Sequence, residues 1–172
     1  MTEVRETVHV LKSIGVLRTP YVKDAPYQPL SEQQGRFMIE LESKFAAGIS
    51  GLDSFKYIYV VYYLDKVIRT GKMMVNPPWA EGVEVGVFAS RSSDRPNPIG
   101  ISVVEVKAVE KNLIYISGID AFDNTPVLDV KPYIDELDAK SDANLGWVEQ
   151  FDNEEHLALH LKGIPHKHYT KE

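Results

Sequence analysis

The first segment whose residue types suit chemistry is 86–100, which reads Gly-Val-Phe-Ala-Ser-Arg-Ser-Ser-Asp-Arg-Pro-Asn-Pro-Ile-Gly. Two prolines flank Asn97 directly after two arginines, a pattern that excludes a helix or a strand paired along its whole length. We therefore expect a rigid loop that presents Arg91 and Arg95. Arginines held in this way lose little entropy when they bind an anion or a carboxylate. The alternative is an edge turn with solvated arginines, which is the more common role of a proline-rich loop.

The second such segment is 123–133, with the sequence Asp-Asn-Thr-Pro-Val-Leu-Asp-Val-Lys-Pro-Tyr. Asp-Asn ahead of a proline predicts a turn, and the alternation that follows places Asp129, Lys131 and Tyr133 on one side of a short strand. Opposite charges two residues apart can also form a surface ion pair of little energetic weight. Taken alone, the segment favours this simpler interpretation.

Metal and thiol chemistry find little support. The chain has no cysteine, which excludes a disulfide, a thiolate zinc site and a cysteine nucleophile. His156 and His160 lie four apart on a predicted helix, a spacing that can bind zinc. Because neither a metalloprotease glutamate nor a third ligand accompanies them, we predict a surface pair and no metal.

Two further enzyme classes lack their motifs. Residues 48–51, Gly-Ile-Ser-Gly, have no lysine and no following helix of the kind a P-loop requires, and the chain contains no G-x-G-x-x-G sequence. There is also no G-x-S-x-G nucleophile elbow. ATP or NAD bound in a standard fold, and a serine hydrolase, are therefore not expected.

The totals describe an ordinary soluble domain. The chain has 172 residues, of which 44% are hydrophobic and 26% charged. No apolar run reaches the roughly 18 to 20 residues of a membrane helix, and the N-terminus has no apolar signal stretch. We expect a cytoplasmic protein.

The net charge of −6 is unevenly distributed. Residues 1–100 carry 12 Lys+Arg against 11 Asp+Glu, whereas residues 101–172 carry 7 against 14. An acidic chain is a poor match for the phosphates of a nucleic acid. An arginine surface must therefore be assembled by the fold, for instance across a dimer.

Short strands separated by turn residues dominate the pattern. The predicted strands are residues 8–17, 37–41, 57–64, 72–75, 83–89, 101–110, 112–120 and 127–130. In the first, Val8, Val10, Ile14 and Val16 are expected on one buried face. Residues 57–64 are apolar throughout, which is typical of a central or interface strand. Residues 110–112 predict a hairpin turn.

Helix is predicted only at 44–49 and at 152–162, where Asp152 is a plausible N-cap. The intervening segments are too short for the helices of a parallel nucleotide-binding sheet. We therefore predict a mainly β protein, a small antiparallel β-barrel with few short helices. The barrel domain is expected at 1–140, with 141–172 as its C-terminal helical extension.

Together the two segments resemble the paired signatures of the TrmO/TsaA family. The family pattern is close to G-V-F-A-T-R-S-P-x-R-P-N-P-I-G, followed by D-G-T-P-V-L-D-I-K-P-Y. Residues 86–100 and 123–133 match both in order and spacing. Residues 14–21, 26–29 and 51–60 resemble the opening strand, its loop and a later strand of the family. The resemblance covers about residues 8–135.

The resemblance implies a small β-barrel that binds S-adenosylmethionine at a homodimer interface and methylates N6 of threonylcarbamoyladenosine beside the anticodon of tRNA. The cofactor contacts that it implies are Pro26, Tyr27, Gln28, Asp65, Lys66, Arg91, Ile101, Ser117, Gly118, Ile119 and Asp120. Tyr27, Gln28 and Ile101 suit an adenine ring, and a cation such as Arg91 suits the methionine carboxylate. Arg95, Asn97 and Lys131 are the expected substrate contacts, with Arg95 alternatively a loop anchor.

Methyl transfer from a sulfonium is an in-line displacement, so positioning can supply much of the acceleration. The N6 proton of the acylated adenine is more acidic than that of adenine, and a weak base is sufficient to remove it. Our candidates are Asp120 and Asp129, with Tyr133 or Lys131 as orienting groups.

The sequence departs from the family pattern at several positions. Ser90 and Ser93 replace threonine and proline, and Asn124 replaces glycine in a turn that asparagine also tolerates. Asp65 stands where many members have histidine. The C-terminal domain of the longer bacterial members is expected to be missing.

Two alternative functions stay open. Asp65 and the acidic second half favour the same cofactor with a small-molecule or peptide amine as methyl acceptor. The other alternative is a non-enzymatic S-adenosylmethionine-binding regulator.

Overall fold

The interior of the fold is built from alternate apolar positions on short strands. The computed structural model describes residues 7–26, 29, 35–77, 80, 82–150, 159 and 164. Its six main strands are β1 (Gly15–Arg18), β2 (Met38–Leu41), β3 (Tyr57–Tyr63), β6 (Ile99–Glu110), β7 (Leu113–Ile116) and β8 (Pro126–Pro132). Fully buried side chains from all six meet inside: Leu17, Ile39, Ile58, Val60, Val104, Ile114 and Val127.

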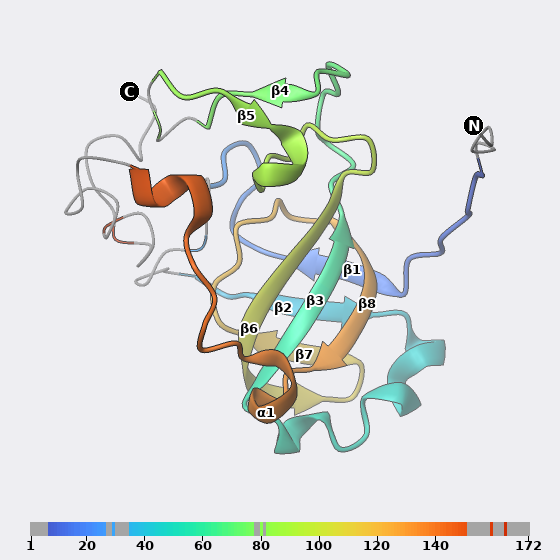
Figure 1. The fold of residues 1–172 in the computed structure, drawn as a ribbon. Helices are drawn as coiled ribbons and strands as arrows, with labels where there is room; N and C mark the ends of the chain where they lie inside the picture. The colour runs from blue at the N-terminus through green and yellow to red at the C-terminus, as the bar shows by residue number, and fades with distance from the viewer. Residues whose placement is uncertain are drawn as a thin grey trace.

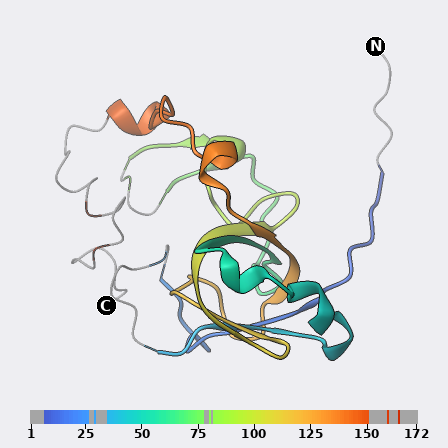
Figure 2. The same ribbon diagram turned by 90° about the horizontal axis from the view of Figure 1, so that it is seen from below.

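The six strands pair antiparallel in the order β1-β2-β7-β6-β3-β8, and β8 returns to pair with β1, which gives a closed barrel (Figures 1 and 2). The short strands β4 (Met74–Val75) and β5 (Val85–Gly86) form a separate pair. This pair lies in the long excursion between β3 and β6, beyond the end of the sheet where β3 finishes (Figure 1).

The helices of the described residues are all short. Four are 3-10 helices: η1 (Ser43–Ile49), η2 (Leu52–Ser54), η3 (Val87–Ala89) and η4 (Gly146–Gln150). The α-helix α1 (Asp135–Asp138) follows β8, has no buried residue and is seen near the lower end of β3 in the view of Figure 1. Within the described part of the chain, none of the helices has the length and apolar character that crossing a bilayer requires. The mainly β prediction is confirmed.

Several predicted elements are confirmed in detail. The apolar alternation of 37–41 is seen at Phe37, Ile39 and Leu41, all of which are buried. The 57–64 strand is present as β3, which pairs with β6 and β8 and buries alternate side chains. The 110–112 turn joins β6 to β7 with Lys111 in the left-handed region at φ 57°. The 44–49 segment is helical, as η1.

The first strand was predicted too long and on the wrong face. Strand β1 begins at Gly15, and Val8 and Val10 are exposed. Gly15 pairs with β2 and β8 at once, and a Cβ there would overlap the backbone of Glu40. At Gly15 the chain passes very close to the backbone of β2. The pairing of β1 with its neighbours therefore starts at this residue, and Leu17 points inward.

Two other strands end earlier than predicted. In the 83–89 segment β5 stops at Gly86, and residues 87–89 form η3. In the 112–120 segment β7 stops at Ile116, and residues 117–125 form a loop to β8. The predicted helix at 152–162 lies outside the described residues, apart from Leu159.

Candidate active site

Asp120 is a polar side chain of the 117–125 loop that turns toward the interior. Its Oδ1 atom is buried and has no hydrogen-bond partner among the described residues. Burial raises the pKa of Asp120 from 3.8 to about 6, although its own backbone N–H, the Tyr62 hydroxyl and the charge of Arg91 each act to lower it. A carboxyl group with this pKa can exchange a proton near neutral pH.

Tyr62 and Ser102 place two hydroxyl groups next to each other on neighbouring strands. Tyr62, on β3, is only 5% exposed, and its hydroxyl lies 3.0 Å from the Ser102 Oγ on β6. Burial and the neighbouring Asp120 raise the pKa of Tyr62, so its phenol remains protonated at neutral pH. The sequence analysis missed both residues, because Tyr62 stands in a run of apolar residues and Ser102 in a predicted strand.

Gly100 makes room for the tyrosine. It lies directly opposite Tyr62 in the β3–β6 pairing, and a Cβ at this position would overlap the Tyr62 ring. This glycine is the last residue of the 86–100 segment. A glycine at the start of a strand is the signal that could have indicated a close ring contact.

Arg91 stands on the solvent side of the same cluster. It is exposed, and its charge lowers the pKa of both Asp120 and Tyr62. The charge of Arg91 therefore acts on Asp120 although the two residues are 29 positions apart in the sequence and form no direct ion pair.

The loop that carries Arg91 is held by hydroxyl groups as well as by its prolines. The Ser90 Oγ accepts a hydrogen bond from the Ser92 N–H at 3.2 Å, and Asp94 accepts one from the Thr70 N–H at 2.9 Å and another from the Thr70 hydroxyl. Arg95 Nη1 donates to the Ser90 carbonyl at 3.3 Å. Arg95 is thus an anchor of the loop.

Lys66 joins the loop after β3 to the loop that carries Asp120. Its Nζ donates to the Asp123 carbonyl at 2.7 Å and lies 5.4 Å from the centre of the Phe122 ring. Asp65 beside it is exposed. Asn124, in the same turn, has φ 65°, the left-handed conformation in which asparagine replaces glycine at small cost.

Some of the other predicted cofactor residues have side chains that form contacts within the fold. The Ser117 Oγ accepts a hydrogen bond from the Glu105 N–H at 3.0 Å, and Ile119 is fully buried in the core. Around Gly118, a ligand can therefore reach the backbone groups and not the side chains of Ser117 and Ile119. Pro26 is half-buried, and Tyr27 and Gln28 lie outside the described residues.

The structure separates Asp129, Lys131 and Tyr133 from the buried cluster. Asp129 pairs opposite Val61 and Lys131 opposite Tyr59, both outward-facing positions of β3. Asp129 and Lys131 form a half-exposed ion pair at 2.7 Å, and the Tyr133 ring packs 5.5 Å from that of Tyr59. These three side chains lie on the outer surface of the sheet.

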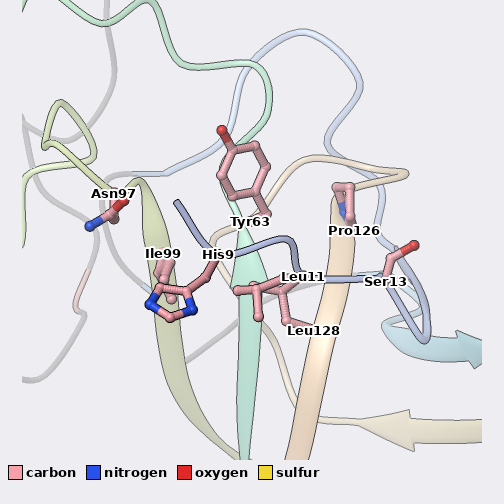
Figure 3. Close-up of a pocket in the computed structure, with 8 residues that line it drawn as sticks. All are labelled: His9, Leu11, Ser13, Tyr63, Asn97, Ile99, Pro126 and Leu128. Atoms are coloured by element: carbon pink, nitrogen blue, oxygen red, sulfur yellow. The ribbon is translucent and has the colours of Figure 1, made fainter. Parts of the chain in front are cut away.

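Two hollows adjoin on the outer surface of β6. The first, of about 430 Å³, is lined by His9, Leu11, Ser13, Tyr63, Asn97, Ile99, Pro126 and Leu128. Figure 3 shows the N-terminal segment crossing in front of β6, β3 and β8, with His9 beside Ile99. The second, of about 370 Å³, shares Asn97 and Ile99 and adds Phe88, Arg95, Pro96 and Ile101. It gathers Arg95, Asn97 and Ile101, three of the predicted contact residues.

Residues 16–139 match the protein family described as the tRNA-methyltransferase O N-terminal domain, which is well over half of the chain. The chain belongs to this family. The resemblance seen in segments 86–100 and 123–133 is thereby confirmed. Both segments contribute residues to the candidate site. Arg91 and Gly100 come from segment 86–100, and Asp123, whose carbonyl accepts the Lys66 hydrogen bond, comes from segment 123–133.

Named relatives of this family are similar along most of the chain. An S-adenosyl-L-methionine-binding protein of Archaeoglobus fulgidus is 40% identical over 136 residues, which cover 75% of this chain and 92% of that protein. The tRNA (adenine(37)-N6)-methyltransferase of Escherichia coli is 32% identical over 148 residues, 80% of this chain and 63% of the enzyme.

The fold is also similar to a solved structure. The crystal structure of TrmO from Pseudomonas aeruginosa superposes with a TM-score of 0.67 at 32% identity, covering 82% of this chain and 63% of that chain. The chain thus spans less than two thirds of the two bacterial proteins, and 38% of a longer Archaeoglobus fulgidus relative to which it is 37% identical.

Proposed function

We propose that this protein is an S-adenosylmethionine-dependent methyltransferase that methylates N6 of threonylcarbamoyladenosine at position 37 of tRNA, next to the anticodon. The observation that carries the proposal is the buried Asp120 carboxyl, on which the charge of Arg91 acts, in a chain of the tRNA-methyltransferase O family. Relatives named tRNA (adenine(37)-N6)-methyltransferase support the reaction and the tRNA position. A tRNA substrate in turn favours the cytoplasm as the site of action.

The groups around Asp120 fit the proposed cofactor. S-adenosylmethionine carries a carboxylate, an ammonium group and a sulfonium centre, and when bound it supplies an electrophilic methyl group. Arg91 offers a cation for the carboxylate, and the unpartnered Asp120 Oδ1 offers an acceptor for an N–H group. Lys66 and the backbone of residues 118–120 complete one side of this environment.

Asp120 is the candidate for the base. At neutral pH a carboxyl with a pKa of about 6 is mostly ionised, yet it binds a proton more tightly than an exposed aspartate does. Its role would be to accept the N6 proton of the modified adenosine when that nitrogen is methylated. Asp129 and Tyr133 are weaker candidates, since Asp129 is already paired with Lys131 and both residues lie on the outer surface.

We also propose a homodimer. Three apolar side chains in alternate positions of β6 are exposed: Ile99 by 40%, Ile101 by 59% and Val103 by 47%. A second copy that covers this row would enclose the hollow lined by Arg95 and Asn97, and would place these polar groups at the edge of a ligand site. Light scattering should give twice the chain mass, and Ile101→Lys should give the monomer.

A second candidate is cofactor binding without methyl transfer. The archaeal relative of which this chain covers 92% is named only as an S-adenosyl-L-methionine-binding protein. In addition, Asp65 puts an exposed acidic group beside Lys66.

The test uses S-adenosylmethionine with a labelled methyl group and total tRNA from cells with and without threonylcarbamoylation. Label is expected only in the modified tRNA, and Asp120→Asn should reduce its rate by about 100-fold, as for loss of a general base. Cofactor binding without label in either tRNA would favour the second candidate. Equal label in both would reject the modified nucleoside as the substrate.

A further inference from the structure

Phe88 is a large aromatic side chain that the fold holds in solvent. Its exposed fraction is 74%, whereas Val87, the residue before it in η3, is buried. The Val87 N–H donates to the Met73 carbonyl at 2.8 Å. On the other side of the ring, the Trp147 Nε1–H donates to the Ala89 carbonyl at 2.8 Å. The backbone is therefore fixed on both sides of Phe88, and the ring is presented outward by a tied turn.

A single exposed apolar residue is common, so the surroundings of the ring decide what it can bind. The Arg95 guanidinium lies 6.0 Å from the centre of the Phe88 ring, and its Nη1 also donates to the Ser90 carbonyl at 3.3 Å. Phe88 and Arg95 both line the second hollow, of about 370 Å³, together with the apolar Ile99 and Ile101. An aromatic face with a guanidinium beside it suits a nucleobase, because bases stack on both kinds of group.

The two segments that meet beside Phe88 carry an excess of positive charge. Residues 69–72 and 91–95 include one acid, Asp94, and four cations: Arg69, Lys72, Arg91 and Arg95. The Thr70 N–H donates to Asp94 at 2.9 Å, which holds the two segments against each other. In a chain with a net charge of −6, this local excess is complementary to the phosphates of a nucleic acid.

We propose that Phe88 stacks on an unpaired base of the substrate tRNA, with Arg95 beside it as the contact for a neighbouring phosphate. That the base belongs to tRNA rests on the proposed function, which places the modified nucleoside next to the anticodon. Single-stranded loops of this kind are where proteins reach the faces of RNA bases.

The charge also distinguishes RNA from the two competing occupants of the hollow. One is the adenine of S-adenosylmethionine, for which Ile101 is an implied contact, and the other is a second copy of the chain. S-adenosylmethionine carries two positive groups and one negative group, and a two-fold related copy brings the same cations to the interface. The excess of positive charge beside Phe88 therefore favours a polyanion over both.

Replacing Phe88 by alanine tests the proposal, and its exposure means that the melting temperature should not change. The measurement is the fluorescence anisotropy of a labelled anticodon stem-loop RNA, without S-adenosylmethionine, at several salt concentrations. The affinity should fall by about tenfold through the loss of one stacked base. The slope of log K against log salt should stay unchanged, because no phosphate contact is lost. Phe88→Trp keeps an aromatic ring and should retain the affinity of the wild type.

Arg95→Gln separates the charge from the stacking. The glutamine amide can still donate to the Ser90 carbonyl, but the cation is lost. This variant should reduce the salt slope by about 0.7, the value for one phosphate contact to a single strand. Leu137→Ala is the matched control, because Leu137 is 67% exposed and lies on α1, near the end of the barrel where β3 begins (Figure 1). It should change neither the affinity nor the slope.

Three results would overturn the proposal. Absence of RNA binding by the wild type, or an unchanged affinity in Phe88→Ala, would show that no base stacks on the ring. An equal loss of S-adenosylmethionine affinity in Phe88→Ala, measured by calorimetry, would assign the ring to the cofactor. Conversion of a dimer to a monomer in light scattering of this variant would assign it to an interface between copies.

Methyl transfer separates this proposal from the proposed function. RNA binding that depends on Phe88, in a protein that transfers no methyl group to tRNA, would refute the proposed function and support the stacking role. Methyl transfer to threonylcarbamoylated tRNA with a KM for tRNA that Phe88→Ala leaves unchanged would refute the stacking role alone.

Discussion

The substitution Asp120→Asn should make the protein more stable at neutral pH while it impairs activity. The side chain keeps its shape but can no longer ionise. In the wild type, burial raises the pKa of Asp120 from 3.8 to about 6, so the folded protein holds this proton more tightly than the unfolded chain does. The free energy of unfolding therefore falls as the pH rises through about 4 to 6, where the folded form binds more protons.

The size of the effect follows from the two pKa values. The interval from 3.8 to about 6 corresponds to about 3 kcal/mol, at about 1.4 kcal/mol for each pH unit. The asparagine amide brings a buried N–H₂ group whose desolvation costs about 1 kcal/mol. We expect a net gain of about 2 kcal/mol at pH 8, which raises the melting temperature by roughly 4 to 8 °C, and a net loss of less than about 1 kcal/mol at pH 4, where the amide cost exceeds the remaining ionisation gain.

Urea denaturation of both proteins at half-unit steps from pH 4 to 8 measures this difference. Asp129→Asn is the control, because Asp129 is half-exposed and paired with Lys131, and its replacement should give no stabilisation at pH 8. A difference between Asp120→Asn and the wild type that does not depend on pH would refute the reasoning. So would an asparagine variant that is less stable than the wild type at pH 8.

Three further substitutions test other parts of the site. Gly100→Ala should destabilise the protein by about 1 to 3 kcal/mol because the added methyl group meets the Tyr62 ring. Gly86→Ala is the control, since the space around Gly86 is open and its stability should change little. Equal effects of the two variants in thermal denaturation would contradict this reasoning. Asn124→Ala should be less stable than Asn124→Gly by about 1 kcal/mol, because the backbone at residue 124 has φ 65°. Chemical denaturation of the two variants measures the difference. An alanine variant that is the more stable of the two would contradict this conformational explanation. Arg91→Ala should weaken the binding of S-adenosylmethionine at least about tenfold, as measured by calorimetry, without lowering the melting temperature. An unchanged affinity would show that Arg91 does not belong to the cofactor site.

Much of the fold could be predicted because its strands alternate on one buried face. Phe37, Ile39 and Leu41 gave both the strand and its orientation, and these residues are all inside. Alternation failed where a strand lacked a partner. Residues 8–14 have the apolar pattern of a strand, but the closed sheet already supplies β8 and β2 as the two neighbours of β1, and pairing begins at Gly15.

The candidate site could be predicted only where a loop sequence constrains it. Arg91 and Asp120 belong to, or lie beside, segments rich in proline, asparagine and aspartate, and in the structure the charge of Arg91 acts on Asp120. Tyr62 could not be found in this way. Its hydroxyl meets the Ser102 Oγ and its ring meets Gly100 only because β3 pairs with β6, and such pairing is decided by the whole sheet.

Strand pairing also explains why Asp129 and Asp120 lie in different places. Asp129 lies within segment 123–133 and Asp120 just before it, and the sequence gives no sign of which one turns inward. The β-bulge between Val61 and Tyr62 shifts the register of β8 and leaves Asp129 opposite an outward-facing residue. A one-residue shift exchanges the two faces of a strand, so this assignment depends on the pairing.

The most direct test of the proposed function is mass spectrometry of tRNA nucleosides after incubation with purified protein and S-adenosylmethionine that carries a trideuterated methyl group. The expected result is a nucleoside with the mass of threonylcarbamoyladenosine plus one deuterated methyl group, located at N6, and absent when the tRNA lacks threonylcarbamoylation. Deuterated methyl on any other nucleoside, or none on tRNA although the protein binds S-adenosylmethionine, would contradict the assignment.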